Sequence, residues 1–158
     1  MRARVFAMVL FLSLVWAMCP LSSAQAQGQS HFTELDKFQG TWVLVSAEMD
    51  GKQVEEAYVK QSKITFVGNK AELIVPHQHK DTIFATFVKM DETKKPMEMQ
   101  WVRSTGPNAG TVVTAIYEFE GPDKYRICFD PTGSTVPKIF DTDEGSGHIW
   151  QTWQRVKQ

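Results

Sequence analysis

FQGTWVLVSAEMDGK (residues 38–52) is the stretch of this chain that decides its fold. Residues 41–49 are rich in β-forming side chains, and Gly40 and Trp42 open the run as a Gly-x-Trp triplet. The dipeptide Asp50-Gly51 closes the run, and it strongly favours a hairpin turn. The stretch therefore predicts one strand of a sheet that ends in a tight turn.

Further short strands follow, and each ends near Gly, Pro, Asn or Asp. Their apolar residues alternate with polar ones, as in a strand with one buried face. Many short strands without a long helix are typical of sandwiches and barrels, and we expect an all-β, antiparallel up-and-down barrel of about eight strands. The predicted strands are 41–49, 62–67, 71–75, 81–90, 97–102, 111–120, 125–129 and 148–157, with a short edge segment at 138–140.

Two segments have helical spacing. Residues 31–38 place Leu35 and Phe38 on one face, which predicts a short N-terminal helix that plugs one end of the barrel. Residues 53–61 fit either a helical turn across the barrel mouth or an irregular loop, and the sequence leaves both open.

Residues 1–26 have the parts of a secretory signal peptide. Arg2 and Arg4 form the charged start, an apolar run follows at 5–18, and 24–26 is an A-x-A cleavage site. The apolar run is too short to span a membrane. We therefore expect export to the periplasm or the extracellular space.

Cleavage after Ala26 leaves 132 of the 158 residues, which is enough for one domain with its own core. We expect a tether at 27–30 and one barrel domain at 31–158, acting as a monomer. Cys19 leaves with the signal, unless it is a lipid-attachment site. Cys128 is then a lone cysteine without an internal partner, and a buried apolar role suits it.

Charge excludes one class of partner. The chain has 17 basic and 18 acidic residues, and loss of the signal brings the net charge to about −3. The charges are interspersed and form no basic stripe that could neutralise phosphates. Nucleic acid is therefore not an expected partner.

Alternation on three strands directs a set of methionines and large apolar side chains to the interior of the barrel. This set has two interpretations. It fills a solid core, or it lines a pocket for an apolar ligand, because methionine and aromatic surfaces adapt to such molecules. The candidate lining residues are Met97, Met99, Trp101, Tyr117, Phe119, Ile127 and Phe129.

His77 and His79 are the best metal candidates in the sequence pattern. On a strand, both rings would lie on one face, and imidazole is a common ligand of zinc and copper. A site also needs a third ligand, from His31 or His148, and two loop histidines beside a proline are the alternative. We therefore expect no metal and no other cofactor, haem included.

No group of residues predicts an enzyme. Glu98, Glu118 and Glu120 could pair for acid–base chemistry, but their spacing places them on solvated strand faces. Ser146, with His148 nearby, could suggest a nucleophile and a base, but a tight turn at 145–147 that feeds the last strand is the better explanation. Residues 106–110 form no phosphate loop, because no Lys-Ser/Thr pair and no helix follow them.

The Gly-x-Trp opening resembles that of lipocalin-like barrels. Five stretches in the same order resemble an uncharacterised secreted domain family that recurs in planctomycete bacteria; they are 39–42 with 50–52, 91–96, 106–110, 116–118 and 145–147. This resemblance implies a lipocalin-like barrel and export, and no established activity.

In lipocalins, an arginine of the last strand packs on the tryptophan of the first. Trp42 and Arg155 match these positions, which implies a structural contact that closes the barrel. The chain lacks the lipocalin cysteine pair and clear second and third motifs, so lipocalin ligand residues do not transfer.

Two functions remain open. The first is an exported binding module for a small hydrophobic or amphipathic molecule. The alternative is an envelope interaction domain with a solid core, which binds a protein or a polysaccharide through Trp150 and the loops at 77–80 and 106–110.

Overall fold

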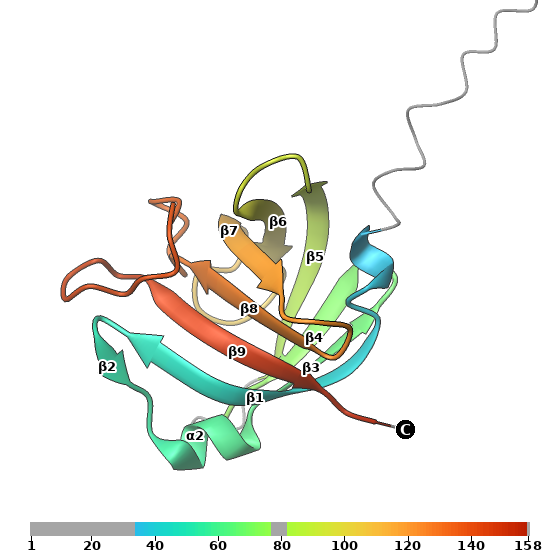
Figure 1. Ribbon diagram of the computed structural model, residues 1–158, viewed down its shortest axis with the longest axis horizontal. Helices are drawn as coiled ribbons and strands as arrows, with labels where there is room; N and C mark the ends of the chain where they lie inside the picture. The colour runs from blue at the N-terminus through green and yellow to red at the C-terminus, as the bar shows by residue number, and fades with distance from the viewer. Residues whose placement is uncertain (1–33, 77–81, 158) are drawn as a thin grey trace, which may run out of the picture.

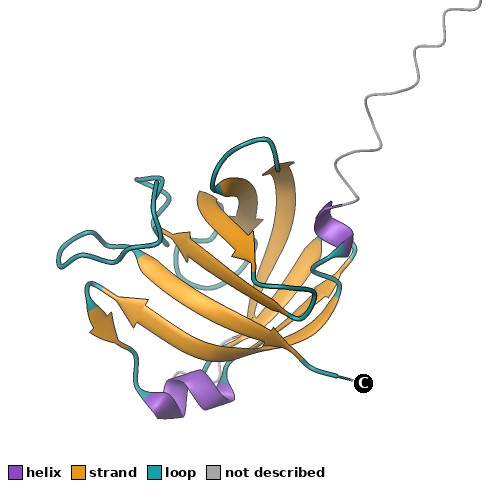
Figure 2. Cartoon of the chain, viewed as in Figure 1, coloured by secondary structure: helices purple, strands orange, loops and turns teal. Residues whose placement is uncertain are grey.

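Eight antiparallel strands close into a barrel in the computed structural model, which describes residues 34–76 and 82–157 (Figures 1 and 2). Neighbours in sequence are neighbours in the sheet, and β1 pairs with β9 to complete the circle. The barrel strands are β1 Gly40–Met49, β3 Lys63–Val67, β4 Lys70–Ile74, β5 Thr82–Asp91, β6 Met97–Arg103, β7 Val112–Phe119, β8 Lys124–Phe129 and β9 Ile149–Arg155.

The predicted barrel is confirmed, and no predicted strand end moves by more than two residues. The Asp-Gly turn is also present. Asp50 and Gly51 both have positive φ, at 49° and 70°, as a two-residue hairpin turn requires. The turn leads into β2, Lys52–Gln53, a two-residue strand that pairs only with the end of β1.

Two bulges set which side chains face the interior. In β1 the register with β9 shifts between Leu44 and Ser46, so the buried residues are Trp42, Leu44 and Ala47. In β5 the register with β6 shifts in the same way, between Phe87 and Lys89. Each bulge inserts one residue and increases the local twist, which helps a sheet to curve into a barrel.

The two ends of the barrel differ. At one end, residues 34–36 form a helical turn, and the side chain of Phe38 is fully buried. Its ring centroid lies 4.7 Å from that of Phe119 and 5.0 Å from that of Tyr125. Trp42 Nε1 fixes this segment by donating to the Phe38 carbonyl at 2.6 Å. Residues 31–33 of the predicted helix lie outside the described part.

At the opposite end lies α2, Glu56–Gln61, which resolves the choice left open for residues 53–61. Its Val59 is buried, and Tyr58 packs against the core from the end of the barrel. No helix within the described residues is both long and apolar enough to cross a membrane.

The edge segment predicted at 138–140 is wrong. These residues bend within the long loop between β8 and β9, and Arg126 lies 4.4 Å above the Phe140 ring on the outer face of the barrel. A closed barrel leaves no free edge beside β8 and β9, because these strands pair with each other. The same loop covers the outward-facing Cys128, whose Sγ contacts the Asp141 carbonyl at 3.5 Å.

Candidate binding site in the barrel interior

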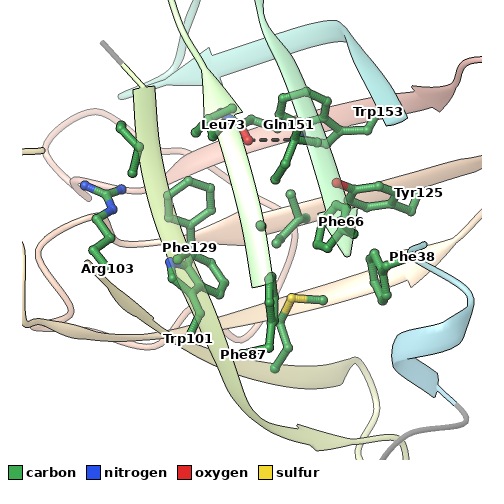
Figure 3. Close-up of a pocket in the computed structure, with 16 residues that line it drawn as sticks. Phe38, Phe66, Leu73, Phe87, Trp101, Arg103, Tyr125, Phe129, Gln151 and Trp153 are labelled. Carbon is green, nitrogen blue, oxygen red and sulfur yellow. Dashed lines mark hydrogen bonds between the residues drawn. The ribbon is translucent and has the colours of Figure 1, made fainter. Parts of the chain in front are cut away.

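A cavity of about 70 Å³ lies inside the barrel (Figure 3). Sixteen residues line it, and Arg103 and Gln151 are the only charged or amide side chains among them. The other lining residues are aliphatic or aromatic apart from the Tyr125 hydroxyl. Buried side chains pack the interior of the barrel around this small apolar space.

The cavity has a deep end and a mouth. Phe38 and Tyr125 lie at the deep end and are buried. Arg103 lies on the other side of the lining aromatic rings from Phe38 (Figure 3), and its side chain is half-buried. A molecule in this space would therefore meet carbon surface inside and one positive charge near solvent.

Of the seven candidate lining residues, four lie against the cavity: Met99, Trp101, Ile127 and Phe129. The other three, Met97, Tyr117 and Phe119, do not line it.

The three residues outside the lining lie at the end that Phe38 fills. The ring centroids of Tyr117 and Phe38 are 5.4 Å apart, and Tyr117 is fully buried. Met97 pairs with Tyr117 across β6 and β7. Alternation places these residues on the interior face correctly, but it says nothing about how far along the axis the plug reaches.

Sequence reasoning missed the lining residues of β3, β4 and β5. Their signal was available, because the same alternation occurs in these strands. It also missed one lining residue of β8, two of β9, the last residue of β6 and Phe38. The missed set is Phe38, Ile64, Phe66, Ala71, Leu73, Ile83, Ala85, Phe87, Arg103, Tyr125, Gln151 and Trp153.

Arg103 lines the cavity, and Tyr58 of α2 packs against the core. Burial lowers the pKa of the Arg103 guanidinium, and the Tyr58 hydroxyl opposes this effect. Burial raises the pKa of Tyr58, and the Arg103 charge opposes that shift in turn. Arg103 Nη1 donates a hydrogen bond of 3.0 Å to the Pro107 carbonyl. Burial is therefore the main perturbation of the pKa of both side chains.

Arg155 and Trp42 meet at the plugged end. The guanidinium carbon lies 4.1 Å from the centroid of the Trp42 ring. Arg155 Nη2 donates to the Lys37 carbonyl at 2.6 Å and to the Pro122 carbonyl at 3.1 Å, and Nε donates to Asp123 at 3.1 Å. Arg155 thereby ties the N-terminal segment and the turn after β7 to the last strand, which is a structural role.

The metal candidates His77 and His79 lie outside the described residues, as does His31. Within residues 34–76 and 82–157, no group of three potential ligand side chains is placed to hold a metal ion. His148 Nε2 instead lies 3.0 Å from the Thr135 hydroxyl in the long loop.

The candidate acid–base carboxylates are engaged by basic side chains on the outside of the barrel. Glu98 pairs with Lys94 at 2.6 Å, and Glu118 pairs with Arg126 at 2.6 Å. Glu120 pairs with Lys124 at 2.7 Å.

No family model matches the chain, and no curated protein matches its sequence. Among solved structures, the chain is similar to a lipocalin-like protein from Bacteroides uniformis, at 13% sequence identity and a TM-score of 0.48. The match covers 76% of this chain and 99% of that one. The narrower resemblance to a planctomycete domain family stays a prediction.

Proposed function

We propose that this protein is an exported, monomeric binding module for a small hydrophobic or amphipathic molecule, and that it performs no catalysis. The observation that carries the proposal is the apolar cavity of about 70 Å³ inside the barrel. Eight-stranded barrels have interiors that side chains just fill or that hold one small ligand. Export rests on the signal-like segment at 1–26, which lies outside the described residues.

The size of the cavity limits the ligand. Sites for drug-sized molecules usually measure about 300–1,000 Å³, so this space suits a short chain or a single small ring. Met99 lines the cavity, and its unbranched thioether adapts more readily to a guest than a branched side chain does.

The test uses 1-hexanol as a probe, with binding followed by NMR shifts of the tryptophan indoles. Ala71 lines the cavity beside its cross-strand partner Ala85, so the larger side chain of Ala71→Leu fills the space. The control is Glu72→Leu, the next residue on β4, which is exposed. We expect the parent and the control to bind 1-hexanol and Ala71→Leu to bind it at least tenfold more weakly.

Native mass spectrometry of protein purified from its own host complements this test, because it would reveal a small molecule that stays bound. If 1-hexanol binds neither the parent nor the control, the barrel works as a solid core and the proposal is wrong. The interaction-domain alternative would then be favoured, without one of its candidates: Trp150 was expected to be exposed, but it is half-buried and its Nε1 is covered.

A further inference from the structure

Arg103 occupies a position where the strand pattern calls for an apolar side chain. It is the last residue of β6, and it follows Met99 and Trp101 on the same face of that strand. All three line the cavity, and Figure 3 shows Trp101 and Arg103 there. Because successive side chains of a strand alternate between faces, Arg103 places a positive charge on the interior side of the barrel mouth.

Arg103 differs from the other two arginines of the described residues. Arg126 pairs with Glu118 at 2.6 Å, and Arg155 pairs with Asp123 at 3.1 Å. Within residues 34–76 and 82–157, no carboxylate forms a salt bridge with Arg103, and its one side-chain hydrogen bond goes to the Pro107 carbonyl. A guanidinium has five N–H donors, so several are available to a ligand.

The surroundings of Arg103 favour an anion. The side chain is half-buried and has lost part of its hydration, yet arginine keeps its charge in proteins. An oxyanion at this point would restore strong hydrogen bonds and would neutralise the charge.

We propose that Arg103 binds the carboxylate of a small monocarboxylic acid whose short apolar chain enters the cavity. This inference rests on the proposed binding function and names the chemical class of the ligand. A carboxylate matches the fork of a guanidinium and forms paired hydrogen bonds with it. The cavity of about 70 Å³ leaves room for only a short chain behind that head group.

The experiment compares hexanoate with 1-hexanol, which has the same chain length and a neutral head group. Affinities for the full mature protein are measured by calorimetry at pH 7 in low salt. We expect hexanoate to bind at least tenfold more tightly than 1-hexanol. We also expect added salt to weaken hexanoate binding and to leave 1-hexanol binding unchanged, because salt screens the charge at the mouth.

Variants assign this preference to one side chain. Arg103→Gln should lose the preference and bind hexanoate no more tightly than 1-hexanol. Arg126→Gln removes an arginine from the outer face and should keep the full preference for hexanoate. The parent protein alone tests the head-group preference, so the inference can be tested even if Arg103→Gln fails to fold.

The outcomes separate the inference from the function on which it rests. If 1-hexanol binds the parent and hexanoate binds no more tightly, the carboxylate inference is wrong and the binding function stands. The inference is also wrong if Arg103→Gln keeps the preference. If neither probe binds, both proposals fail.

Discussion

At the scale of the single residue, neighbours decide what an interior side chain contributes to stability. Met99 and Tyr117 are both almost completely buried, but Met99 borders the cavity and Tyr117 packs against Phe38. Truncation of a core side chain costs about 2–5 kcal/mol, and the cost falls where fewer neighbouring atoms are lost.

We therefore expect Tyr117→Ala to lower the free energy of unfolding by more than Met99→Ala does, with Tyr117→Ala near the upper end of that range. Urea unfolding of both variants measures the difference. Because the Met99 side chain borders the cavity, Met99→Ala should also enlarge the space and strengthen binding of 1-hexanol. Equal losses of stability and unchanged binding would contradict the assignment of Met99 to the cavity wall and of Tyr117 to the packed end around Phe38.

At the scale of the element, the loop between β8 and β9 is held by the carboxylate of Asp130. Burial opposes its ionisation, but hydrogen bonds from the amides and hydroxyls of Thr132 and Thr135 outweigh this and lower the pKa of Asp130. Since the folded pKa lies below the unfolded value of about 3.9, its stabilising effect is present above about pH 4 and is lost as the pH falls further.

Cys128 reports on the opening of this loop. Burial raises the pKa of its thiol to about 11, so the folded protein should react slowly with a thiol reagent at pH 8. Asp130→Asn weakens the acceptor that holds the loop and should accelerate the reaction. Asp143→Asn alters an exposed carboxylate of the same loop and should leave the rate unchanged. Equal rates in the two variants would show that Asp130 does not hold the loop closed.

The elements themselves could be predicted from the sequence because alternation and turn residues are local signals. The run from Met97 to Trp101 and the Asp50-Gly51 turn each carry their own evidence. The bulge after Leu44 could not be predicted, because an extra residue becomes necessary only where β1 curves against β9. The cover over Cys128 was equally hidden, since it comes from a loop without a periodic pattern.

The candidate site was predicted in part for the same reason. Trp101 and Phe129 follow from alternation, whereas the reach of Phe38 depends on how the N-terminal segment enters the barrel. Arg103 was missed because the predicted strand stopped one residue before it.

At the scale of the whole molecule, Trp42 joins the plug, the first strand and the last strand. It is fully buried, and its ring lies 4.8 Å from that of Tyr125 and 4.1 Å from the Arg155 guanidinium. We expect Trp42→Ala to lower the free energy of unfolding by about 3–5 kcal/mol. Val45→Ala, at an exposed position of the same strand, should cost far less. In urea unfolding, a loss below about 1 kcal/mol for Trp42→Ala would mean that the ring does not anchor the core.

The pairing of β1 with β9 affects how the protein folds during its synthesis. The Gln39 carbonyl and the Arg155 guanidinium that bonds to it are 116 residues apart, so the first strand receives its second neighbour only when the chain is almost complete. Contacts between such distant residues form late and slow the folding of β proteins. Until then, β1 and β8 each present an unsatisfied strand edge to other chains. A nascent chain that stalls before β9 is therefore the form of this protein most prone to aggregate.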